Sequence, residues 1–242
     1  MTTIMSTLFF GVLRSNDRVA VKPHASPVLH AIEYLCGRQT REQLEHFRSL
    51  GGAQSYPSRT KDRIDVDFST GSVGLGVAIT AFASLTQDYL KAHGWLDPAL
   101  EGRMIALLGD AELDEGNIYE CLIEAYKHDI RNCWWVVDYN RQSLDSTTAD
   151  RMFRRFDDIF ETCGWRVVTL KNGKLQRAAF SRPGGKSLED WIENCPNADF
   201  AVLTYKGGAA WRERLIADIG GKPHVAKLLD SFDDDGLAAL MT

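Results

Sequence analysis

The sequence predicts an α/β protein built on a doubly wound, mainly parallel sheet with helices on both faces. Two apolar runs, residues 104–108 and 133–137, are separated by a helix-like segment. Strands that are apolar throughout belong in a parallel sheet covered on both sides, and strand–helix–strand is the building unit of such sheets. Polar residues follow each run, and ligands of open α/β sheets bind at the carboxyl ends of the strands.

Size and charge narrow the possible functions. The chain has 242 residues, of which 44% are hydrophobic and 25% charged, and its formal net charge is −5. These are ordinary globular values, and the acidic balance argues against partners such as nucleic acid or an anionic membrane. The apolar segment at residues 8–13 is too short to span a membrane. Five cysteines without a C-x-x-C pair favour free thiols and a cytoplasmic location.

Hydrophobic periodicity and turn residues predict the other elements. Further helices are expected at residues 4–13, 28–35, 40–50, 77–90, 149–163 and 209–217, and further short strands at residues 19–21, 165–170 and 201–204. Thr40 with Gln43, and Asn117 with Glu120, are expected to cap two helices. Residues 51–67 are expected to form a loop. Because no repeat or long linker interrupts the pattern, we expect a single domain over residues 1–242.

Oxygen-bearing side chains follow both central strands. Asp110 supplies a carboxylate after the first strand, Asn140 supplies an amide oxygen after the second, and Gln142 follows two residues later. Two or three oxygens with a single charge are a poor cage for a bare metal, but they suit Mg²⁺, which completes its octahedron with phosphate oxygens and water. An isolated Gly-Asp is more often only an acidic cap. The second cluster, placed after a second strand, favours the metal site.

The string GDAELDE, followed one strand later by DYNRQSLD, resembles the thiamine diphosphate motif, which starts Gly-Asp-Gly and ends in Asn. It is similar to the homodimeric pyruvate dehydrogenase decarboxylating component and its transketolase relatives. The resemblance implies that Asp110 and Asn140 are side-chain ligands of Mg²⁺ and that Gln142 is a backbone-carbonyl ligand. The metal would anchor the diphosphate of thiamine diphosphate. The residues around Asp110 would also bind this cofactor: Gly109, Ala111 and Glu112.

Two further segments resemble the same family. His-Ala-Ser-Pro, residues 24–27, is similar to the family's Gly-His-x-Ser segment, which implies that His24 is the catalytic residue and that Ser26 lies at the cofactor. The glycine-rich stretch before the helix at 77–90 resembles the loop whose backbone faces the cofactor. The resemblance implies cofactor contacts for Gly71, Ser72, Val73 and Gly74, with Val73 supporting the aminopyrimidine. Four other histidines are expected on the surface or on helix faces: His30, His46, His93 and His128.

The resemblance covers nearly the whole chain but only half of an active site, because the family's pyrimidine-binding domain is absent from these residues. It implies the diphosphate-binding half or subunit of a thiamine diphosphate- and Mg²⁺-dependent enzyme that acts on a small-molecule substrate and needs a second chain. The first interpretation is that the enzyme is a pyruvate or other 2-oxo acid dehydrogenase decarboxylating component, with a lipoyl-bearing acyltransferase as a further partner. The alternative is the N-terminal subunit of a split transketolase that transfers ketol units between sugar phosphates. The expected partner is a complementary pyrimidine-domain chain in a heterotetramer, or a second copy of this chain.

Three positions depart from the family pattern. Ala111 stands where Gly is usual, and Asp138 stands where the family often has Asn. Ser58 stands where homodimeric pyruvate dehydrogenases have a histidine after the matching Tyr-Pro. These departures favour a further alternative, a non-catalytic or truncated assembly subunit that keeps the fold. The complete set of proposed metal ligands favours a cofactor site instead.

Overall fold

The computed structural model describes residues 1–140, 142–143, 146–147 and 151–241. The chain divides into two compact units, one of residues 1–144 with 162–165 and the other of residues 145–161 with 166–242. The expectation of a single domain over residues 1–242 stays a prediction.

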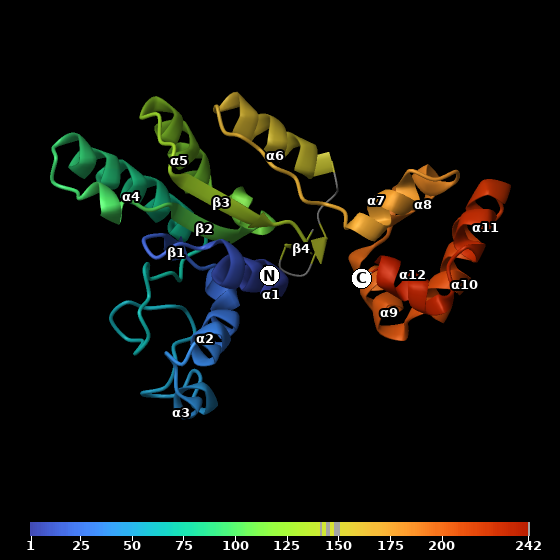
Figure 1. The fold of residues 1–242 in the computed structure, drawn as a ribbon, viewed down its shortest axis with the longest axis horizontal. Coiled ribbons are helices and arrows are strands. Elements are labelled where there is room, and N and C mark those ends of the chain that lie inside the picture. The colour runs from blue at the N-terminus through green and yellow to red at the C-terminus, as the bar shows by residue number, and fades with distance from the viewer. Residues whose placement is uncertain (141, 144–145, 148–150, 242) are drawn as a thin grey trace. The chain divides into compact units, whose positions relative to one another are not determined.

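The first unit is built on three parallel strands, β1 (Arg18–Ala20), β2 (Met104–Gly109) and β3 (Cys133–Asp138), which lie in that order (Figure 1). The register pairs Ala20 with Ala106 and Gly109 with Asp138. Every residue of β2 is buried, as expected for a central strand covered on both faces. Both apolar runs around the central helix therefore form strands as predicted.

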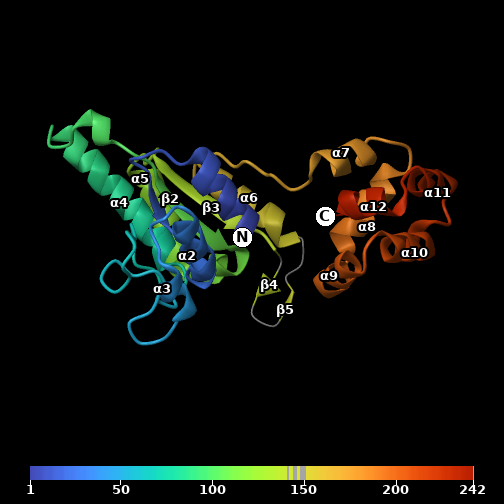
Figure 2. The same ribbon diagram turned by 60° about the horizontal axis from the view of Figure 1, so that its bottom comes forward.

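Helices cover both faces of this sheet, as Figures 1 and 2 show. On one face, α1 (Thr2–Thr7) and α2 (Ser26–Leu35) share a core with Val19 and Ile105 of the strands. On the other face lie α4 (Leu75–Ala92) and α5 (Gly116–Lys127), which pack together with Trp135. The predicted architecture, a parallel sheet flanked by helices, is confirmed. The first unit also contains a π-helical turn, Leu8–Val12, the short α3 (Arg41–Glu45), and the 3₁₀ turns Pro23–Ala25, Pro98–Leu100 and Asp110–Asp114. The short strand β4 (Gln142–Ser143) belongs to the first unit, and the short strand β5 (Ser146–Thr147) belongs to the second.

Apart from the short strand β5, the regular elements in the described part of the second unit are helices. Its helices are α6 (Arg151–Thr162), α7 (Lys174–Phe180), α8 (Gly185–Asn194), α9 (Asn197–Lys206), α10 (Gly208–Ile219), α11 (Pro223–Asp230) and α12 (Asp234–Met241). Trp211, Leu215 and Leu229 lie at the centre of its apolar core. None of the helices in the described residues of the chain is long and apolar enough to cross a membrane.

Two strand predictions in the C-terminal part are wrong. Residues 165–170 form no regular element, and residues 201–204 lie inside α9. A short apolar run does not by itself distinguish a strand from a buried turn of helix. Here Leu203 faces the helical core while the neighbouring Val202 is half exposed, so the run serves a helix face.

The two predicted capping pairs have different outcomes. Thr40 Oγ1 accepts a hydrogen bond from the N–H of Gln43 at 3.2 Å, as predicted, but the Gln43 amide donates to the carbonyl of Gly51 instead of completing a capping box. The pair Asn117 with Glu120 is wrong, because α5 already begins at Gly116. The 3₁₀ turn Asp110–Asp114 leads directly into α5, so Asn117 falls within the helix.

A buried ion pair joins the segments that enter β1 and β2. The carboxylate of Asp17, which is 8% exposed, accepts hydrogen bonds from the N–H groups of Arg14 and Arg103 at 2.9 Å each and from the Arg103 guanidinium. The Arg103 guanidinium also lies 4.3 Å from the ring centroid of Trp134. Burial alone would raise the pKa of Asp17, but the hydrogen bonds from Arg103 and Arg14 outweigh it and lower the pKa to about 2.

Asp17→Asn should lower the free energy of unfolding by about 3 kcal/mol at neutral pH, because Arg103 would keep a largely buried charge without its carboxylate. The pKa of Asp17 is depressed in the folded chain from the usual 3.8. Its stabilisation is therefore complete above pH 3.8 and is lost as the pH falls toward 2, so the difference between parent and variant should shrink over that interval. Urea unfolding across this pH range measures both effects. The control is Asp129→Asn, which breaks an Arg–Asp pair whose side chains are 81% and 74% exposed, so the loss of stability should be much smaller than in Asp17→Asn. Equal losses in the two variants would contradict the prediction.

Candidate functional site

The carboxyl ends of the three parallel strands form one edge of the sheet. Because Ala20 pairs with Ala106 and Gly109 pairs with Asp138, the residues that follow β1, β2 and β3 come together at this edge. Lys22 follows β1, Asp110 follows β2 and Asn140 follows β3. In open α/β sheets this is the edge at which ligands bind.

The three predicted metal-binding segments lie at this edge. Asp110 is 4% exposed and opens the 3₁₀ turn Asp110–Asp114, where its Oδ1 accepts a hydrogen bond from the N–H of Ala111 at 3.1 Å. Asn140 is exposed, and its N–H donates to the carbonyl of Asp138 at 3.1 Å. The backbone of Gln142 lies in β4, which contacts the turn that Asp110 opens; its side chain lies outside the described residues. Coordination of a metal by these residues stays a prediction.

The Glu112 carboxylate joins the glycine-rich turn to the end of β2. Its Oε2 accepts a hydrogen bond from the N–H of Gly74 at 3.2 Å and its Oε1 accepts one from the N–H of Gly109 at 3.0 Å, and the residue is 6% exposed. Two backbone groups that the sequence offers to the cofactor are therefore bonded to a protein carboxylate. The structural role of Glu112 is to hold the two loops together through these hydrogen bonds. Its contact with a cofactor stays a prediction.

Gly74 must be glycine for two reasons. Its φ is +81°, and a Cβ there would lie 2.8 Å from Oδ1 of Asn117 and 3.0 Å from Cβ of Glu115. The same Asn117 has a buried Nδ2 with no hydrogen-bond partner among the described residues. A buried donor without a partner is costly, so this amide marks a place where a ligand acceptor would be stabilised. Elsewhere in the turn, Gly71 and Ser72 are exposed and Val73 is half buried, and their predicted cofactor contacts stay predictions.

Lys22 is a site residue that the sequence analysis missed. Its Nζ lies 2.0 Å from the point that a Cβ on Gly109 would occupy, so the ammonium packs over the end of β2 because residue 109 is glycine. The backbone carbonyl of Lys22 accepts from the N–H of Ala25 at 2.9 Å, but no salt bridge or hydrogen bond joins its ammonium to another residue in the described ranges. The available signal was its position at the end of a short strand, two residues before His24.

His24 lies in the 3₁₀ turn Pro23–Ala25 immediately before α2 and is exposed. Its ring meets the ring of Tyr56 nearly edge-on, with the centroids 6.0 Å apart and the planes at 70°. Ser26 is fully buried, and its hydroxyl donates to the carbonyl of Ser55. This bond fastens the following loop to α2, whereas contact of Ser26 with a cofactor stays a prediction.

His30 was expected on the surface or on a helix face, and it lies on a fully buried face of α2. Its Nε2 lies 3.2 Å from the carbonyl oxygen of Gln54 and 3.8 Å from Oδ1 of Asp62, and its Nδ1 lies 3.0 Å from Nε2 of Gln39. Asp62 in turn accepts hydrogen bonds from the N–H groups of Gln54 and Ser58 at 2.9 and 2.8 Å. These buried polar groups give the loop after α3 a fixed shape.

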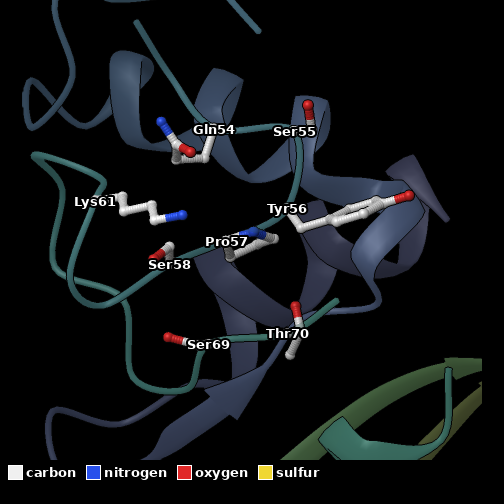
Figure 3. Close-up of a pocket in the computed structure, with 8 residues that line it drawn as sticks. All are labelled: Gln54, Ser55, Tyr56, Pro57, Ser58, Lys61, Ser69 and Thr70. Carbon is white, nitrogen blue, oxygen red and sulfur yellow. The ribbon is translucent and has the colours of Figure 1, made fainter. Parts of the chain in front are cut away.

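This loop encloses a polar pocket. The cavity has a volume of about 280 Å³ and is lined by residues 54–58 together with Lys61, Ser69 and Thr70 (Figure 3). Tyr56, which contacts His24, forms part of its wall. Residues 51–67 were predicted only as a loop, because a pocket made by a folded loop leaves no periodic pattern in the sequence.

The fold and its polar edge are typical of α/β proteins that bind a phosphate-bearing ligand where parallel strands end. Comparison with known families identifies which family of such proteins the chain belongs to. The chain belongs to the family described as "Transketolase, thiamine diphosphate binding domain", whose model matches residues 14–180. The match covers the sheet and extends into the first helices of the second unit.

Individual relatives agree with this family. The chain is 28% identical over 229 residues to the pyruvate dehydrogenase E1 component of Escherichia coli K12, which covers 93% of this chain and 25% of that protein. It is 26% identical over 226 residues to the same component of Corynebacterium glutamicum, and the match covers 90% of this chain and 24% of that protein. The transketolase structure from Leishmania mexicana is similar in fold, with a TM-score of 0.64 at 21% identity over 80% of this chain and 30% of that one. The transketolase structure from Campylobacter jejuni gives a TM-score of 0.56 at 24% identity, and the match covers 74% of this chain and 27% of that one. The chain thus spans about a quarter of the length of these two curated relatives.

Glu112→Ala should lower the free energy of unfolding by about 2–4 kcal/mol, because it leaves two buried N–H groups, those of Gly74 and Gly109, without an acceptor. Urea unfolding measures the loss, and hydrogen exchange should show faster exchange at these two amides. The control is Glu120→Ala, an exposed position on α5, which should change stability by less than about 0.5 kcal/mol. Unchanged protection of both amides in Glu112→Ala would contradict the bridging role.

Proposed function

We propose that this chain is the diphosphate-binding part of a thiamine diphosphate-dependent enzyme. The proposal rests on one observation: the family's motif lies at the carboxyl edge of the sheet, with Asp110 buried after β2 and Asn140 following β3. Oxygen atoms that could ligate a metal and N–H groups that could donate hydrogen bonds both occur at this edge.

The residues at this edge fit the cofactor and its metal. Asp110 offers a buried carboxylate, and Asn140 and the backbone of Gln142 offer neutral oxygens, a donor set that suits Mg²⁺ shared with phosphate oxygens. The Asn117 amide and the Lys22 ammonium offer donors to phosphate oxygens. The cofactor, when bound, supplies the carbanion chemistry that cleaves a bond beside a carbonyl.

His24 is the proposed proton-handling residue. Imidazole is the side chain best suited to exchange protons near neutral pH. His24 is exposed and its ring rests against Tyr56, so it can approach a substrate oxygen while its position stays restrained. Its part would be to hold or move a proton at that oxygen.

For the whole enzyme we propose decarboxylation of a 2-oxo acid, supported by identity to pyruvate dehydrogenase E1 components. A lipoyl-bearing acyltransferase would then receive the acyl group, and a complementary pyrimidine-domain chain or a second copy of this chain would complete the site. An alternative is ketol transfer between sugar phosphates, which the polar pocket beside Tyr56 favours. A non-catalytic assembly role is favoured by Ala111 and Asp138, which depart from the family pattern. The five free thiols favour the cytoplasm as its location.

Asp110→Asn should weaken Mg²⁺-dependent binding of thiamine diphosphate by at least about a hundredfold, a loss of about 2.7 kcal/mol, because it removes the charged metal ligand. Calorimetric titration with the cofactor and Mg²⁺ measures the affinity, and circular dichroism checks the fold. The control is Asp114→Asn, an exposed carboxylate on the same turn, which should bind like the parent. If both variants bind cofactor as the parent does, the metal assignment is wrong.

Lys22→Met should weaken thiamine diphosphate binding by about tenfold and reduce its dependence on salt, because it removes an ammonium while keeping a side chain of similar length. Thiamine, which has no phosphate, should bind the variant and the parent equally. The control is Lys127→Met, which changes an exposed lysine at the end of α5. An equal loss of affinity for thiamine and thiamine diphosphate would show that Lys22 shapes the site without contacting the diphosphate.

A further inference from the structure

The helical second unit contains a pocket of its own, at the place where α8, α9 and α10 lie beside one another (Figure 2). Its volume is about 190 Å³, and its lining comes from the end of α8, the connection to α9 and the second half of α10. The lining residues are Trp191, Asn194, Cys195, Pro196, Arg214 and Asp218. The residues proposed to hold the cofactor belong to the first unit, so the proposed function does not account for this pocket.

The core of the unit holds the aromatic wall of this α8–α10 pocket in place. The ring of Trp191 meets the buried ring of Trp211 nearly edge-on, with the centroids 5.9 Å apart and the planes at 79°. The indole Nε1–H of Trp191 donates to Oδ2 of Asp218 at 2.9 Å, which fastens α8 to α10. Because Trp191 is restrained both by packing and by this hydrogen bond, the pocket needs little rearrangement to receive a ligand, which lowers the entropic cost of binding.

The Asp218 carboxylate offers the pocket a negative charge and an available oxygen. Its Oδ2 accepts hydrogen bonds from Nε of Arg214 at 2.6 Å and from Trp191. These hydrogen bonds lower the pKa of Asp218 from the usual 3.8, so the carboxyl group is ionised at neutral pH. Its Oδ1 has no hydrogen-bond partner among the residues that the structure describes. This oxygen can therefore accept a hydrogen bond from a donor that enters the pocket.

The charges around the pocket favour a positively charged ligand. Besides its bond with Asp218, Arg214 has its Nη2 3.5 Å from Oδ2 of Asp199 on α9. Two carboxylates therefore share one guanidinium, which leaves negative charge in excess. Trp191 and Pro196 give the lining apolar surface, and an aromatic ring attracts a cation as well as packing against an alkyl chain. An anion would have to compete with both carboxylates for Arg214.

We infer that the α8–α10 pocket binds a small primary alkylammonium ion, which donates to Oδ1 of Asp218 and packs its alkyl chain against Trp191 and Pro196. The volume of about 190 Å³ is smaller than that of sites for drug-sized ligands and suits an amine with a few carbon atoms. A ligand of this size is expected to bind with a dissociation constant of roughly 1 mM. By contacting both α8 and α10, it would also stabilise the helical unit.

Titration of n-butylamine hydrochloride into the full chain at neutral pH, with the indole Nε1–H of Trp191 followed by NMR, tests the inference. This proton is bonded to the same carboxylate, so its signal should shift as the ammonium binds. 1-Butanol has a similar shape without the charge, and butyrate has the opposite charge, so neither should shift the signal at the same concentration. Ammonium chloride should bind at least about fivefold more weakly, because it has no alkyl chain to bury.

Asp218→Asn should weaken the binding of butylamine at least about tenfold, because it removes the charge that attracts the ammonium. Circular dichroism checks that the helices are intact. The control is Asp230→Asn, which removes an exposed carboxylate at the end of α11, outside the lining, and should bind within about twofold of the parent. The comparison of butylamine with 1-butanol in the parent tests the role of charge without any substitution.

The inference is overturned if butylamine leaves the Trp191 signal of the parent unchanged, or if 1-butanol or butyrate binds as tightly as butylamine. Equal affinities of Asp218→Asn and the parent, or equal losses in Asp218→Asn and Asp230→Asn, would also overturn it. Binding of ammonium chloride as tight as that of butylamine would show a surface ion site only, without a role for the apolar walls.

Discussion

A single buried carboxylate sets the geometry of the cofactor edge. Gly74 and Gly109 belong to segments that are distant in sequence, yet both of their N–H groups donate to Glu112. Buried backbone donors must find acceptors, so the two loops hold their places because the 3₁₀ turn after β2 brings Glu112 back over the strand end. The same turn fixes Asp110, which opens it. The start of α4, the end of β2 and the predicted metal ligand thus form one rigid arrangement.

Charge balance at this edge explains which groups gather there. Asp110 and Glu112 are two buried acidic residues separated by one residue in sequence, and buried charges are stable only when they are compensated. Hydrogen bonds from the N–H groups of Gly74 and Gly109 compensate Glu112, and the carboxylate of Asp110 accepts one from the N–H of Ala111. A diphosphate held by a metal at Asp110 would bring further negative charge, and Lys22 lies where an ammonium can offset it. The absence of a side chain on Gly109 is what lets that ammonium approach.

The parts of this arrangement that follow one another in sequence could be predicted, and the parts that meet only in space could not. Asp110 and Asn140 follow apolar strands directly, so strand patterning placed them at one edge. Lys22 was missed because its proximity to Gly109 depends on the register of β1 and β2, which no local pattern encodes. The burial of His30 was not predicted because its partners, Gln39, Gln54 and Asp62, lie outside regular elements, where no periodicity reveals them. Residues 201–204 were predicted as a strand because a short apolar run fits the periodicity of a strand and that of a buried helix equally well.

The loop that forms the pocket and the strand edge that would hold the diphosphate are parts of one frame. The buried hydroxyl of Thr70 donates to the carbonyl of Val21 at 2.8 Å, and the Ser26 hydroxyl donates to the carbonyl of Ser55. These bonds tie both ends of the pocket loop to the chain that runs from β1 through His24 into α2. The walls of the pocket, Tyr56 among them, are therefore held in a fixed position relative to His24, whose ring contacts that of Tyr56.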